Sequence, residues 1–241
     1  MWNELPDATV QILAGGDQNE VGSGFHLRSG EIVVTNAHVA HPYIRTDQSV
    51  YARTESGEIN ELQLVEHSPA DEYDFAVLET TSDWSEDRTS LQPDPEQPVR
   101  GTEVLFSGHP LGYSELLVHS GTVSGPAEDG FSVDASVNKG NSGGAVVDPD
   151  SGNVLGIITL KGAVSPEGLD ELHEAWSEVY FAAKNNSVTI QMGGIDQNEL
   201  NRLIAHSFDT LNQLIEVNSS TGIGRAVSIE YVDEAVDAYL S

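Results

Sequence analysis

Short runs of β-branched and aromatic residues, separated by glycine, proline or acidic turns, fill the first two thirds of the chain. They lie at residues 10–14, 24–28, 32–35, 50–54, 62–65 and 75–79, and again at residues 103–107, 116–123, 131–134, 144–147 and 154–160. Short strands that recur with turn signals between them are typical of an antiparallel barrel or sandwich. The proline-rich residues 93–98 separate the two sets, so we expect two β units joined by a linker.

The pattern changes its period after residue 164. Ser165 and Pro166 are typical of a helix N-terminus, and apolar residues then recur at spacings of three and four, as they do again through residues 197–216. Residues 187–192 suit a strand between these two helices, and residues 222–240 predict a final strand followed by a helix. We therefore expect a mainly helical insertion at residues 165–219. Its apolar stripes face either its own core or a protein partner.

The composition is that of a globular protein with no thiol chemistry. Hydrophobic residues make up 38% of the 241 residues, and there is no cysteine, which excludes disulfides, a thiol nucleophile and cysteine-ligated zinc. No apolar run approaches the roughly 18 residues needed to span a bilayer, and the first residues lack the basic and apolar regions of an export signal. We expect a cytoplasmic protein.

The charge is strongly biased in sign. Thirty-nine acidic residues against 10 basic ones give a formal net charge of −29, although charged residues make up only 20% of the chain. Binding to nucleic acid or to an anionic membrane needs clustered lysine and arginine, so neither partner is expected. Carboxylates spaced roughly 16 Å apart on a chain of this size repel one another in dilute buffer but are screened in molar salt. We interpret the chain as adapted to high salt. The alternative is an acidic protein that has no such adaptation.

Three polar segments stand out from this background. The first is Gly-Ser-Gly-Phe at residues 22–25 followed by Val-Thr-Asn-Ala-His-Val at residues 34–39. The second is Tyr-Asp-Phe-Ala-Val-Leu at residues 73–78, and the third is Asp-Ala-Ser-Val-Asn-Lys-Gly-Asn-Ser-Gly-Gly-Ala at residues 134–145. A serine hydroxyl becomes a nucleophile when a histidine removes its proton, and the histidine needs a carboxylate to fix its tautomer. The candidates are His38, Asp74 and Ser142. Asp71 is the second choice for the acid, because only Asp74 directly precedes the Phe-Ala-Val-Leu strand.

The glycines around Ser142 suit a further requirement of acyl transfer. Backbone N–H groups that converge on one point need residues without a Cβ at strained positions. Gly140 and Ser142 are therefore candidate donors to a developing oxyanion.

Together these segments resemble the chymotrypsin-fold (trypsin-like) serine peptidases, specifically their HtrA/Deg-like branch. Further similar segments lie at residues 106–112, 120–124, 156–159 and 222–227, and the match covers about residues 8–163 and 220–240. The resemblance implies an all-β core of two six-stranded antiparallel β-barrels. Residues 1–92 would form the first barrel. Residues 98–163 with 220–241 would form the second barrel and a C-terminal helix.

The resemblance also implies roles for individual residues. His38 would be the base, Asp74 the orienting carboxylate and Ser142 the nucleophile of a serine endopeptidase that acts through an acyl-enzyme, without metal or cofactor. Residues Thr159, Leu160 and Lys161 would pair with an extended polypeptide substrate. Ser136, six residues before Ser142, would form the base of the specificity pocket, where a small neutral side chain favours a small or medium apolar P1 residue.

The chain departs from the family pattern in several places. The insertion at residues 165–219 is unusual, and we expect it to cap the cleft, block access or bind a protein partner. No length remains for a PDZ domain. His109 stands where the family usually has asparagine, and we interpret it as structural. Surface or packing roles are expected for all histidines except His38, namely His26, His41, His67, His109, His119, His173 and His206.

Two alternatives to an active enzyme remain open. One is a catalytically silent module that binds peptides or a partner through residues 165–219. The other is a latent protease that a partner switches on, which predicts a misoriented peptide bond between Lys139 and Gly140.

Overall fold

The computed structural model describes residues 4–14, 19–46, 49–69, 71–110, 115–159, 191–192, 195–196, 206–207 and 222–240. The chain divides into two compact units, Met1–Lys161 with Gly222–Ser241, and Gly162–Thr221. In the second unit the short strands β12 (Gln191–Met192) and β13 (Ile195–Asp196) pair antiparallel. The long helices expected within residues 165–219 lie outside the described residues.

The first unit begins with a closed antiparallel barrel of six strands. These are β1 (Thr9–Ala14), β2 (Asn19–His26), β3 (Ile32–Thr35), β4 (Val50–Arg53), β5 (Ile59–Ser68) and β6 (Phe75–Thr80). Their order around the barrel is β1-β2-β3-β6-β5-β4. Alternate residues such as Val10 and Ile12 point inward and pack with Val33, Val50 and Leu78.

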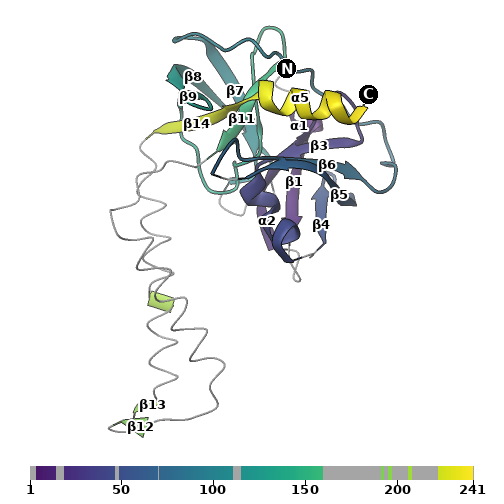
Figure 1. Cartoon of the computed structure of the whole chain (residues 1–241), viewed down its shortest axis with the longest axis vertical. Coiled ribbons are helices and arrows are strands. Elements are labelled where there is room, and N and C mark those ends of the chain that lie inside the picture. Colours follow the sequence, from purple (N-terminus) through teal and green to yellow (C-terminus); the bar gives the residue numbers. More distant parts are fainter. Residues whose placement is uncertain are drawn as a thin grey trace. The chain divides into compact units, whose positions relative to one another are not determined.

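The second barrel has the same architecture but is assembled from distant parts of the chain. Its strands are β7 (Glu103–Gly108), β8 (Leu117–Ala127), β9 (Gly130–Asp134), β10 (Ala145–Val147), β11 (Val154–Thr159) and β14 (Ile223–Ser228). The order is β10-β11-β14-β9-β8-β7, so β14 closes the barrel between β11 and β9. The expected double barrel of the chymotrypsin type is confirmed (Figure 1).

Both ends of the chain pack between the barrels. Helix α1 (Leu5–Ala8) and helix α5 (Ile229–Leu240) contribute to one buried cluster with Phe25 of the first barrel and Ile157 of the second. On the surface, Arg28 donates from Nε to Asp233 over 2.8 Å and lies 3.2 Å from Asp237. The two barrels are therefore held as one body. No helix in the described part of the chain is long and apolar enough to cross a membrane.

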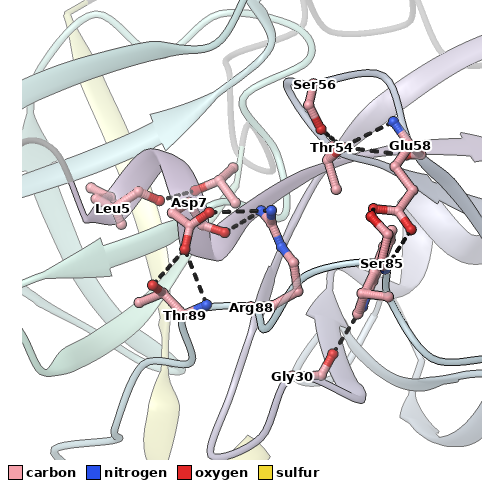
Figure 2. Close-up of polar contacts among 11 residues, drawn as sticks. Leu5, Asp7, Gly30, Thr54, Ser56, Glu58, Ser85, Arg88 and Thr89 are labelled. Atoms are coloured by element: carbon pink, nitrogen blue, oxygen red, sulfur yellow. Dashed lines mark hydrogen bonds and ion pairs between the residues drawn. The ribbon is translucent and has the colours of Figure 1, made fainter.

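The connector between the barrels is docked along its length. Figure 2 shows Arg88 and Thr89 meeting Asp7, with Thr89 donating from Oγ1 over 2.5 Å. Trp84 donates from its indole N–H to the carbonyl of Gly30 over 3.0 Å. The predicted linker at residues 93–98 does join the barrels, and Asp94 N–H bonds to the carbonyl of Val154 in β11. Hydrogen bonds from its own residues thus fix the connector to both barrels.

Candidate active site

His38 lies at the start of a helix that the sequence pattern did not reveal. Strand β3 ends at Thr35, and helix α2 (Ala37–Thr46) follows at once. The carbonyl of Asn36 accepts hydrogen bonds from the amides of Val39 and Ala40 over 3.1 and 3.2 Å. The backbone N–H of His38 donates to Asp74 Oδ1 over 3.1 Å. A carboxylate at a helix N-terminus is stabilising, so Asp74 supports the first turn of α2.

The side chains of His38 and Asp74 also meet. Nδ1 of His38 lies 2.9 Å from Oδ2 of Asp74, which is fully buried, whereas 40% of the His38 side chain is exposed. A carboxylate only accepts, so Nδ1 carries the proton and the far nitrogen, Nε2, is left as an acceptor in the neutral ring. Asp71, the second choice for the acid, is exposed. The hydrogen bonds thus distinguish the two candidate acids.

The backbone of Asp74 is fixed on both sides. Its N–H donates to the carbonyl of Pro69 over 3.1 Å, and its carbonyl accepts from Nδ2 of Asn36 over 2.9 Å. Its φ of 49° lies in the left-handed region, which aspartate tolerates better than most residues. This conformation turns the side chain of Asp74, which directly precedes β6, toward α2.

Ser142 belongs to the second barrel but is docked on the first. Its carbonyl accepts from the backbone N–H of Ser23 over 2.9 Å. Gly22 marks how close the segments lie, because a Cβ there would stand 2.8 Å from Cγ2 of Val39 and 2.9 Å from the carbonyl oxygen of Ser142. Val39 directly follows His38. The backbone of Ser142 is therefore brought beside the segment that carries His38, and Ser142 itself is only 4% exposed.

The residues before Ser142 form a tight turn. Asn141 N–H donates to the carbonyl of Asn138 over 3.0 Å, and Gly140 has a φ of 97°. Lys139 does not have a positive φ. An i→i+3 hydrogen bond with positive φ only at the third residue defines a type II turn. Gly140 is required here for a second reason, since a Cβ would overlap the carbonyl oxygen of His109.

Comparison with known proteins identifies the family. The family described as "Trypsin-like peptidase domain" matches residues 22–157, more than half of the chain. The chain belongs to the trypsin-like peptidase family. The positions of His38, Asp74 and Ser142 lie within the matched range.

Individual relatives indicate the HtrA-like branch of this family. "Serine protease HtrA-like" of Staphylococcus aureus (strain USA300) is 31% identical over 164 residues, which is 60% of this chain and 20% of that protein. This chain thus spans about a fifth of the length of that relative. The crystal structure of the serine endoprotease from Yersinia pestis is 28% identical with a TM-score of 0.54, over 66% of this chain and 55% of that one. The crystal structure of Deg5, 24% identical with a TM-score of 0.55 over 66% and 82%, shares the fold.

Two of the expected substrate-binding residues, Ser136 and Thr159, belong to the second barrel. Ser136 is exposed, and the next residue, Val137, is buried against Gly224 of β14. Thr159 ends β11 and pairs with Arg225. Leu160 and Lys161 lie outside the described residues. The predicted pocket base and the end of the predicted peptide-pairing strand are thus both parts of the second barrel.

Three histidines have packing surroundings, as expected. His26 is buried and contacts Trp84 edge to face with ring centres 5.6 Å apart, and burial lowers its pKa to about 4. His109 is also buried, and its backbone N–H donates to Oγ of Ser23 over 3.0 Å. His119 is partly buried and stacks on Phe106 with ring centres 4.9 Å apart, and burial lowers its pKa.

The motifs included three polar residues, Ser23, Thr35 and Asn36, to which sequence reasoning gave no role. All three are fully buried, and each makes a hydrogen bond that positions a candidate segment. The available signal was a polar side chain within a strand or directly after one. Ser23 is also flanked by Gly22 and Gly24, which have no side chains.

Proposed function

We propose that the chain is a serine endopeptidase that cleaves polypeptides through an acyl-enzyme. The observation that carries this proposal is the hydrogen-bonded pair of Asp74 and His38 next to the segment on which Ser142 is docked. A base oriented by a carboxylate is what a serine hydroxyl needs to become a nucleophile.

Each residue has one role in the proposed reaction. The Nε2 atom of His38 takes the proton of the Ser142 hydroxyl as its Oγ bonds to the scissile carbonyl carbon. His38 then gives this proton to the leaving amine as the peptide C–N bond breaks. A water molecule attacks the acyl-enzyme with His38 again as the base, which releases the new carboxylic acid and restores the Ser142 hydroxyl. Asp74 holds the ring in the required tautomer and stabilises the imidazolium that forms; it is not itself protonated.

The turn at residues 138–141 supports a site that is active without a partner. In a type II turn the middle peptide bond, here between Lys139 and Gly140, has the orientation opposite to that in a type I turn. We assign the N–H groups of Gly140 and Ser142 to the oxyanion, and the left-handed Gly140 is what permits the first of them to turn toward Ser142. A latent protease would need this peptide bond reversed.

The substrate is proposed to bind as an added strand. An extended polypeptide would pair with the backbone that follows Thr159, and its P1 side chain would enter a pocket at Ser136. Ser136 has no charge, and Val137 beside it is apolar. This favours a small or medium apolar P1 residue over lysine or arginine.

Fluorophosphonate labelling tests the proposal directly. The wild-type protein should be labelled at one serine in 2 M KCl, and peptide mapping should place the label on Ser142. The Ser142→Ala variant, checked for folding by circular dichroism, should not be labelled. A folded wild-type protein that stays unlabelled would contradict an active serine peptidase and leave the peptide-binding module and the latent protease as the explanations.

A further inference from the structure

The hydroxyl of Ser23 joins two loops of the second barrel, although Ser23 itself belongs to the first. Oγ of Ser23 donates to the carbonyl of Gly140 over 2.7 Å and accepts from the N–H of His109 over 3.0 Å. A Cβ on Gly108 would lie 2.9 Å from the same oxygen. The side chain is fully buried, so water does not replace these bonds.

The backbone of Ser23 adds two more contacts at the same point. Its N–H donates to the carbonyl of Ser142, and its own carbonyl accepts from Oγ1 of Thr35 over 2.7 Å. Gly143, with a φ of 92°, is pressed against that carbonyl and has no room for a Cβ. One residue of β2 thus contacts both sides of the segment that carries the proposed nucleophile.

The bond to Gly140 acts on one particular peptide unit. The unit between Gly140 and Asn141 has its carbonyl bonded to Ser23 and its N–H bonded to the carbonyl of Asn138. Both polar ends are therefore held, and the plane of this unit is fixed. The N–H groups of Gly140 and Ser142 belong to the peptide units immediately before and after it, so their directions depend on this plane.

We propose that Ser23 is a positioning residue that keeps the two oxyanion donors aligned. This inference rests on the proposed function. Ser23 does not touch the substrate. It acts through the Gly140–Asn141 peptide unit, and the same hydroxyl holds His109, whose carbonyl lies against Gly140.

Two variants of Ser23 and one control separate alignment from stability. Ser23→Ala removes the hydroxyl, and Ser23→Cys keeps a group of similar size that is a weaker donor and acceptor. The control is Thr9→Val, because Oγ1 of Thr9 makes two buried bonds, donating to the carbonyl of Leu5 over 2.7 Å and lying 2.6 Å from Oγ of Ser107 in the other barrel. Neither bond is to the turn at residues 138–141. Thr9→Val loses comparable buried bonds and keeps the shape of the side chain.

The readouts are the rate constant of fluorophosphonate labelling, and kcat and KM for an activated ester. Removal of one oxyanion donor costs about 10²–10³ in kcat, so misalignment should lower kcat and the labelling rate of Ser23→Ala roughly tenfold to hundredfold. KM should change by less than about threefold, the labelled fraction should still reach that of the wild type, and Ser23→Cys should fall between the two. Thr9→Val should keep the wild-type rates.

The outcomes distinguish the two proposals. A wild-type protein that is not labelled contradicts the proposed function, and this inference fails with it. A labelled wild type with Ser23→Ala reacting at the same rate overturns only the role of Ser23. Equal rate losses in Ser23→Ala and Thr9→Val also overturn it, because they would reflect general loosening of the barrels. If Ser23→Ala does not fold, the rate of Ser23→Cys decides in the same way.

Discussion

One carboxylate, that of Asp74, holds two separate atoms of His38. Oδ2 lies 2.9 Å from the ring atom Nδ1, and Oδ1 lies 3.1 Å from the backbone nitrogen. Both bonds run from a donor on His38 to an acceptor on Asp74. The position of the ring and the start of helix α2 are therefore set by the same group.

Replacing Asp74 by asparagine should separate geometry from charge. An amide can accept from only one of the two donors and presents N–H to the other, so the ring tautomer becomes wrong. We expect kcat to fall about 10⁴-fold, with the fold retained. The exposed Asp71 provides the control, and Asp71→Asn should keep wild-type kcat. Equal activities of the two variants in an ester assay would contradict the assignment of Asp74.

Gly140 and Gly57 form a second matched pair. Both have φ near 90°, but Gly57 has open space where a Cβ would go, whereas Gly140 meets the carbonyl of His109. Gly57→Ala should cost only the left-handed strain, about 1 kcal/mol, and leave kcat unchanged. Gly140→Ala should lower kcat about 10²-fold or more, because the turn must change shape. Urea unfolding and ester hydrolysis measure the two effects. A folded Gly140→Ala variant with normal kcat would argue against the oxyanion assignment.

Much of the fold follows from local pattern, and what was missed depends on long-range contacts. The runs of β-branched and aromatic residues between turn signals located the strands of both barrels, although β2 begins at Asn19 rather than at the expected residue 24. Helix α2 was missed, because a carboxylate 36 positions away from His38 supports its first turn. Ser23 stands in the first motif but was given no role for the same reason, since its partner Gly140 lies 117 positions along the chain. The motifs identified the three candidate catalytic residues but not the residues that hold them in place.

His26 should make the protein sensitive to acid. Burial, with a smaller effect of Arg88, lowers its pKa to about 4, while Asp7 and the carbonyl of Ile32 act in the opposite direction. The unfolded chain, with a histidine pKa of 6.5, binds more protons between pH 6.5 and 4, so stability decreases as the pH falls through this window. The loss is roughly 3 kcal/mol at pH 4.

A phenylalanine at position 26 tests this expectation. His26→Phe keeps an aromatic ring beside Trp84 but does not titrate. The free energy of unfolding is measured for both proteins from pH 7.5 to 4, and the difference at pH 7.5 gives the effect of packing alone. The variant should gain on the wild type steadily below pH 6.5. A constant difference across the range would show that His26 is not the titrating group.

Salt should stabilise the protein through screening of its net charge of −29. Repulsion among carboxylates is felt over a Debye length of about 10 Å at 0.1 M and is nearly lost at 1 M. The midpoint of thermal unfolding should therefore rise between 0.1 and 2 M KCl. Choline chloride at the same ionic strength is the control for specific potassium binding and should act similarly in the range below 1 M. A thermal midpoint that does not change with salt concentration would favour an acidic protein that is not adapted to high salt.

The strand that closes the second barrel is synthesised long after its neighbours. β14 fills the gap between β9 and β11, which are both made before residue 160. Until residue 228 is available, these two neighbours present unpaired edges, and α5 has not yet filled the space between the barrels. The loop of Ser142 rests on β11 through the bond from Gly143 to Ile158. A nascent chain on the ribosome thus carries all three candidate catalytic residues long before it has the scaffold to hold them, and this order of synthesis delays assembly of the site until β14 and α5 have been made.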